Sequence, residues 1–142
     1  MIALDTNMLA RFYVLDDGDA ESKAQHEQVV LALSQRERFW VPKTVVLELE
    51  WVLRGFYQRD RKDVLRVLEH LIAMPNVTLE DEATVRAAIA GLRSGLDFAD
   101  ALHHASSKQC EKFLTFDDKR FARPAGRRKL EPPVVVPQRR RS

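Results

Sequence analysis

Acidic side chains stand at five points where the chain is expected to leave a strand or to begin a helix. They are Asp5, Glu48, Asp97, Asp100 and Asp117. Carboxylates that meet at one end of a sheet repel each other unless a cation lies among them. A hard divalent metal ion, which prefers oxygen ligands, is the simplest such cation. These residues therefore indicate a metal-dependent enzyme that acts on phosphate esters.

The elements that must position these acids are predicted from the pattern of apolar residues. Short apolar runs, typical of buried parallel strands, occur at 2–4, 39–41, 77–79, 113–115 and 134–136. Helical spacing of apolar residues occurs between them, at 45–56, 64–72, 85–92 and 98–105. Alternating strands and helices predict an α/β protein, with a central parallel sheet of about five strands between two layers of helices.

In such a sheet, ligands bind beyond the carboxyl ends of the strands. Asp5 directly follows the first predicted strand, and Asp117 closely follows the fourth. If these strands are neighbours, the two acids meet in one crevice. Helices that begin near Asp5 and Asp97 would direct their N-termini at it, which favours the binding of phosphate oxygens.

Each acid also has a purely structural explanation. Asp5, Asp97 and Asp117 are equally well explained as helix N-caps, and Asp97 with Asp100 resembles a capping box. Glu48 lies near the apolar stripe of its predicted helix, which suggests that it points inward, whereas Glu50 is expected on an exposed face. The alternative for Glu48 is a buried ion pair with an arginine.

Length and composition fit one core. The chain has 142 residues, of which 45% are apolar and 31% are charged. No apolar stretch is long enough to span a membrane, and Asp5 and Arg11 interrupt the first apolar run, so no signal peptide is expected. Cys110 is the only cysteine and has no partner for an internal disulfide. We therefore expect a cytoplasmic protein without a membrane partner.

The positive charge is concentrated at the C-terminal end. From Lys119 to Ser142 there are nine Lys and Arg against one acid, Glu131, so this end carries +8 and the rest of the chain −6. Such an asymmetry indicates contact with a polyanion. We expect the polyanion to contact the basic residues shortly after Asp117, namely Arg123, Arg127, Arg128 and Lys129. Residues 137–142, with Arg139, Arg140 and Arg141, are expected to form a basic tail that serves solubility.

Four segments together resemble a known family. They are Met-Ile-Ala-Leu-Asp-Thr-Asn at 1–7, Val-Leu-Glu-Leu-Glu-Trp-Val-Leu at 46–53, Asp-Phe-Ala-Asp-Ala-Leu at 97–102 and Leu-Thr-Phe-Asp at 114–117. In this order and spacing they are similar to a PIN domain, and most similar to the VapC-type toxins of bacterial toxin–antitoxin pairs. The resemblance covers nearly the whole chain and implies one PIN-like nuclease domain at 1–136.

The resemblance implies an activity and a set of roles. The protein would be an endoribonuclease that cleaves RNA and depends on Mg²⁺ or Mn²⁺. A small antitoxin would block this activity, and the protein would form a homodimer. Asp5 and Asp100 would bind the metal directly. Glu48, Asp97 and Asp117 would complete the catalytic set, and Thr6 and Thr115 match hydroxyl positions that orient it.

Two other classes of protein compete with this interpretation. The first is a non-catalytic PIN-like module that binds RNA or a partner; the loss of an acid would have favoured it, and none is missing. The second is an aspartyl-phosphate phosphatase, which would need an aspartate two residues after Asp5, where Asn7 stands. Among the histidines, His104 is expected at the surface, and His26 and His70 on helices without a catalytic role. Trp40 and Trp51 are expected in the core or at an interface.

Overall fold

The computed structural model describes residues 1–15 and 19–138, and it divides into two compact units, Met1–Glu82 and Ala83–Ser142. Each unit is described by itself. The predicted role of Arg139, Arg140 and Arg141 lies outside the described residues. The expectation of one domain at 1–136 stays a prediction.

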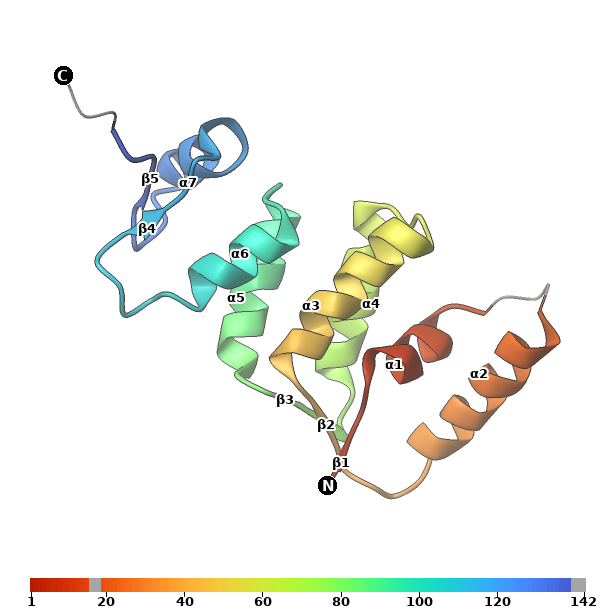
Figure 1. The fold of residues 1–142 in the computed structure, drawn as a ribbon. Coiled ribbons are helices and arrows are strands. Elements are labelled where there is room, and N and C mark those ends of the chain that lie inside the picture. The colour runs from red at the N-terminus through yellow and green to blue at the C-terminus, as the bar shows by residue number, and fades with distance from the viewer. Residues whose placement is uncertain (16–18, 139–142) are drawn as a thin grey trace. The chain divides into compact units, whose positions relative to one another are not determined.

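The first unit is built on a three-stranded parallel sheet. β1 (Ile2–Ala3) pairs with β2 (Phe39–Val41), and β2 pairs with β3 (Val77–Leu79), so that β2 is the central strand (Figure 1). Phe39 and Val41 are buried on this strand. Each strand is short because it ends at a polar or proline residue that begins the following segment, such as Asp5 after β1 and Pro42 after β2.

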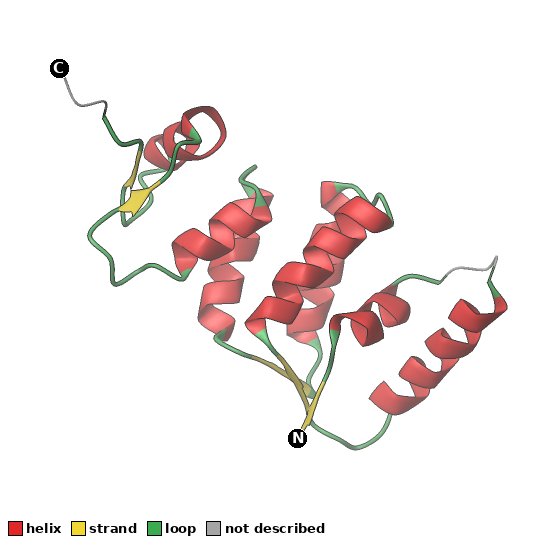
Figure 2. Cartoon of the chain, viewed as in Figure 1, coloured by secondary structure: helices red, strands yellow, loops and turns green. Residues whose placement is uncertain are grey.

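Helices fill the connections between these strands (Figure 2). They are α1 (Thr6–Tyr13), α2 (Ala20–Leu33), α3 (Lys43–Trp51) and α4 (Arg61–Ala73), and α3 continues into a π-helical turn, η1 (Val52–Phe56). α4 is amphipathic and buries Val64, Leu68 and Leu71. α1 packs against both α2 and α3. This packing brings the residues that follow β1 next to the helix that follows β2.

The second unit combines two helices with a short parallel strand pair. Helices α5 (Glu82–Arg93) and α6 (Phe98–Ala105) are followed by β4 (Phe113–Leu114), the π-helical turn η2 (Asp118–Ala122), α7 (Arg123–Arg127) and β5 (Val134–Val135). β4 and β5 are parallel, with Phe113 opposite Val134. Both helices are amphipathic, and they bury Val85, Ala88 and Ile89 from α5 and Phe98 and Leu102 from α6.

Five strands and the four helical segments were predicted, and all are present. Every strand pair is parallel, which confirms the α/β class. In the described part of the chain the strands form one sheet of three and one sheet of two, not one sheet of five. No helix among the described residues has the length and apolar character that crossing a bilayer requires.

Gly91 sets how closely α5 and α6 approach each other. A Cβ atom built on Gly91 would lie 2.7 Å from the Cβ of Ala101, which is closer than two carbon atoms tolerate. Gly126 in α7 differs, because a Cβ atom added there would meet nothing within 4 Å. The first glycine is therefore required by packing, and the second is not.

We expect Gly91→Ala to destabilise the protein by about 1–3 kcal/mol, because α6 must move away from α5. Gly126→Ala is the matched control, and it should be neutral or stabilising by up to about 1 kcal/mol because alanine is the better helix former. Thermal or urea unfolding of both variants measures the difference. Equal effects of the two substitutions would contradict the close contact of α5 with α6.

Candidate active site

In the first unit, Asp5 and Glu48 lie on either side of one buried threonine. Asp5 is the N-cap of α1, and its Oδ1 accepts a hydrogen bond of 2.8 Å from the backbone N–H of Thr6. The hydroxyl of Thr6 donates to Oε1 of Glu48 on α3. Thr6 is only 3% exposed, so it is a fixed link between the two acids. These contacts bring together acids that stand 43 positions apart in the sequence.

The predicted orientation of the acids on α3 was wrong. Glu48 is exposed apart from its bond to Thr6, whereas Glu50 is buried and its Oε1 accepts from Nε of Arg54 at 3.1 Å. The buried stripe of this segment consists of Val46, Leu49, Glu50 and Leu53, so it shares only Leu49 and Leu53 with the predicted stripe. The prediction relied on a constant helical spacing as far as Phe56, but Phe56 lies in the π-helical turn η1, where the number of residues per turn is larger, and it is exposed. The predicted ion pair with an arginine therefore belongs to Glu50.

In the second unit, two further aspartates begin helical turns. Asp97 is the N-cap of α6, and its Oδ2 accepts from the backbone N–H of Asp100 at 3.1 Å. Asp117 is the N-cap of η2, and its Oδ1 accepts from the backbone N–H of Arg120 at 3.0 Å. The N–H of Asp117 in turn donates to the hydroxyl of Thr115 at 3.0 Å. Both predicted threonines thus contact residues of the candidate site.

Asp5, Asp97 and Asp117 are all N-caps, which confirms the structural explanation of each. The cap engages one carboxylate oxygen in every case, and the other oxygen has no hydrogen-bond partner among the described residues. The caps hold the carboxylates in place, while they leave one oxygen of each for a ligand. Capping and ligand binding are therefore compatible in this protein.

Asp100 differs from these three because it is half-buried and caps nothing. Burial raises its pKa above the ordinary value, and the negative charges of Asp97 and then Asp117 raise it further, while His103 lowers it. The three aspartates of this unit thus lie in one electrostatic field. Carboxylates that repel one another in this way are stabilised by a bound cation.

The donor chemistry fits a hard divalent cation, because all five predicted site residues offer carboxylate oxygens. Within the residues that the structure describes, no three His, Cys, Asp or Glu side chains are placed to hold a metal ion. Each unit carries a share of the predicted set, with two acids in the first and three in the second. The predicted meeting of Asp5 and Asp117 at neighbouring strands stays a prediction.

The prediction that His104 lies at the surface was also wrong. The residue is 7% exposed, and its Nε2 lies 2.8 Å from the carbonyl oxygen of Pro132. It occupies the face of α6 that packs on aromatic residues, a contact between distant segments that helix periodicity did not reveal. His26 and His70 lie on helices as predicted, and each forms a hydrogen bond with a residue of α1. Nδ1 of His26 bonds with the carbonyl oxygen of Arg11, and Nδ1 of His70 bonds with the hydroxyl of Tyr13.

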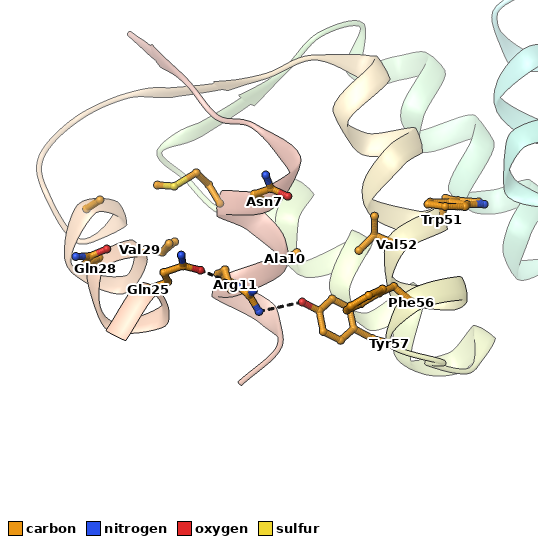
Figure 3. A pocket seen from close by; sticks show the side chains of 12 residues that line it. Asn7, Ala10, Arg11, Gln25, Gln28, Val29, Trp51, Val52, Phe56 and Tyr57 are labelled. Carbon is orange, nitrogen blue, oxygen red and sulfur yellow. Dashed lines mark hydrogen bonds between the residues drawn. The ribbon is translucent and has the colours of Figure 1, made fainter. Parts of the chain in front are cut away.

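The sequence did not predict a pocket that the structure shows in the first unit. It measures about 800 Å³ and lies between α1, α2, α3 and η1 (Figure 3). Nε of Arg11 donates to Gln25 at 2.9 Å and its Nη1 to the hydroxyl of Tyr57 at 3.2 Å. Trp51 lines the pocket and is 62% exposed, so its predicted core role is wrong. An aromatic residue off the buried stripe of α3 is the sequence signal that points to this surface.

We expect Asp100→Asn to stabilise the metal-free protein more at pH 7 than at pH 4. The folded-state pKa of Asp100 is raised, so the folded protein holds this proton more tightly than the unfolded chain does. Stability is therefore lost as pH rises through the interval above the ordinary aspartate pKa, and asparagine avoids that loss. Thermal unfolding of both proteins in EDTA at the two pH values tests this. A shift in Tm that is the same at both would contradict the raised pKa.

Comparison with known proteins identifies the family of this chain. The family model for the PIN domain matches residues 2–127. A protein of Aquifex aeolicus (strain VF5) named "VapC ribonuclease" is 31% identical over 112 residues, which cover 77% of this chain and 80% of the relative. The expected family is therefore confirmed, and the chain belongs to the PIN domain family.

Proposed function

We propose that this protein is a metal-dependent endoribonuclease that acts as the toxin of a toxin–antitoxin pair. The observation that carries the proposal is the set of fixed, solvent-accessible carboxylates on N-caps of a PIN domain. The name of the Aquifex relative, a VapC ribonuclease, supports RNA as the substrate. The toxin role implies a small cognate antitoxin, and we further propose a cytoplasmic homodimer.

The catalytic set consists of Asp5, Glu48, Asp97, Asp100 and Asp117, with Mg²⁺ or Mn²⁺ bound directly by Asp5 and Asp100. When bound, such an ion supplies positive charge for the phosphate oxygens and makes a coordinated water more acidic. The other three acids accept hydrogen bonds from water and orient it. The reaction is the hydrolysis of a phosphodiester, in which the oxygen of water bonds to phosphorus and the leaving oxygen takes up a proton.

The proposed set takes two acids from the first unit and three from the second. Three contacts support a prearranged site within the units. Thr6 fixes Glu48 relative to the cap of α1, and the caps at Asp97 and Asp117 fix the starts of α6 and η2.

Asp5→Asn, Asp100→Asn and Glu48→Gln should each reduce RNA cleavage by at least about 100-fold and leave the protein folded, because each removes a charge that the cation needs. Glu50→Gln is the matched control for Glu48. It should lower Tm, because Glu50 is buried against Arg54, and should keep activity at temperatures where the protein is folded. Cleavage of a labelled RNA, with EDTA and with Mg²⁺ or Mn²⁺ restored, measures these effects.

Three outcomes would contradict the proposal or one of its parts. Wild-type cleavage in EDTA that is unaffected by added metal would exclude the metal-dependent reaction. RNA binding without cleavage, unchanged in the three acid variants, would favour the non-catalytic binding module instead. Equal loss of activity in the Glu48 and Glu50 variants at a temperature where both are folded would show that Glu48 has no special role.

The basic end offers cations for the RNA backbone. Arg123 is already paired with Asp118 at 2.8 Å, and Arg128 donates to the carbonyl of Pro124 at 3.2 Å and to that of Ser94. The side chains of Arg127 and Lys129 are exposed and have no partner among the described residues. Of the four predicted contacts, these two can therefore reach a phosphate without first breaking an interaction.

We expect Arg127→Gln/Lys129→Gln to weaken RNA binding and to reduce the slope of log affinity against log salt by about 1–2, because fewer counterions are released. The loss should be similar for RNAs of different sequence, since phosphate contacts do not read bases. Arg59→Gln/Lys62→Gln removes the same charge from exposed positions of the first unit and is the control. An unchanged slope in the first variant, or the same change in both, would assign the RNA surface to another part of the protein.

A further inference from the structure

His104 lies at the point where the helix that carries Asp100 meets the strand pair. Its Nε2 is 2.8 Å from the carbonyl oxygen of Pro132, just before β5. A carbonyl oxygen only accepts, so Nε2 carries the proton and donates it. With its ring buried and this nitrogen engaged, His104 is not placed to exchange a proton with RNA.

Two aromatic rings complete the surroundings of His104. The centroid of its ring lies 6.3 Å from that of Phe113 on β4 and 6.4 Å from that of Phe121 on η2. Phe113 and Phe121 contact each other at 5.3 Å. Phe121 is fully buried, so these side chains form a packed cluster. His104 therefore ties α6 to β4, η2 and the start of β5 at once.

The elements joined by this cluster carry the acids of the second unit. Asp100 precedes His104 by one turn of α6, and Asp117 lies between β4 and η2 as the cap of that turn. A shift of β4 and η2 against α6 would change the separation of the two carboxylates. The two carboxylates are near enough for the charge of Asp117 to raise the pKa of Asp100, after burial and Asp97.

We propose that His104 is a positioning residue that fixes the Asp117 carboxylate relative to that of Asp100 through its hydrogen bond to Pro132 and its packing on Phe113 and Phe121. Its effect on catalysis rests on the proposed ribonuclease function; its effect on the structure does not. The hydrogen bond gives the contact a direction that apolar packing alone lacks. A group held in this way behind the acids affects the rate without touching the substrate.

The test compares two substitutions of His104 with a core control. His104→Leu removes the donor and keeps an apolar side chain, whereas His104→Gln keeps an N–H that can reach the Pro132 carbonyl. Val85→Ala on α5 creates a cavity in the same unit and leaves the three side chains of the cluster unchanged. Two quantities are measured below the Tm of every variant: amide hydrogen exchange at Arg120, whose N–H binds Asp117, and kcat and KM for RNA cleavage.

We expect His104→Leu to speed exchange at Arg120 and to lower kcat about tenfold or more with little change in KM, because none of the three cluster residues is a proposed RNA contact. His104→Gln should restore much of the slow exchange at Arg120 and much of kcat. Val85→Ala should change neither quantity beyond what its lower global stability causes. If His104→Leu does not fold, Phe121→Leu takes its place, because it loosens the same cluster. The inference is overturned if the Leu variant matches the Val85 control, or if the glutamine recovers nothing.

The two proposals can fail separately. If the wild-type protein cleaves no RNA, the ribonuclease function fails, and the exchange at Arg120 still decides whether His104 holds Asp117. If the wild type cleaves RNA and exchange at Arg120 is the same in all variants, the ribonuclease function stands and the positioning role falls.

Discussion

The repulsion between carboxylates is the constraint on which the candidate site depends. A fold that brings such charges together must hold them against that repulsion until a cation binds. Here the holding is done by backbone N–H groups at the starts of helical turns, at Asp5, Asp97 and Asp117. Because one oxygen of each side chain suffices for the cap, the same residue begins a helix and presents charge. The cap thereby links the folding of these turns to the geometry of the site.

Asp100 does not act as an N-cap. It is half-buried, and its neighbours Asp97 and Asp117 are negatively charged, so its pKa is raised first by burial and then by these charges. A side chain in this position opposes folding at neutral pH, which is unfavourable unless a ligand compensates. Groups whose pKa is perturbed by burial together with specific charges are often functional. Asp100 is thus the residue of the second unit whose environment is hardest to explain by structure alone.

Local features of the sequence predicted the elements well. Apolar runs such as Phe39–Val41 and Val77–Leu79 are followed by a proline or a polar residue, and this pattern predicted the ends of the strands and the starts of the helices after them. The aspartate caps were predicted as alternatives for the same reason, since a cap depends on residues within three positions of it. The burial of His104 was not predictable in this way, because it depends on Pro132, 28 positions later, and on two rings from other elements. The start of α3 also depends on a residue that is distant in the sequence. Its N-cap residue, Pro42, has no side-chain acceptor, and the carboxylate of Glu80 accepts the hydrogen bond from the N–H of Lys43 instead.

The orientation of α3 has a different physical origin. A constant spacing assigns an inward direction to Glu48, but the helix buries Val46, Leu49 and Leu53 and widens into a π-helical turn from Val52. Glu50 then lies among the buried residues, where it needs Arg54, and Glu48 lies on the side of α1, where the hydroxyl of Thr6 reaches it. Turns of this kind inside helices are rare and are frequently found at functional sites. Glu48 and Glu50 both lie in α3, before this turn begins. Two residues that are two positions apart in an α-helix point in directions about 200° apart. The burial of Glu50 against Arg54 therefore places Glu48 on the opposite side of the helix, where the hydroxyl of Thr6 reaches it.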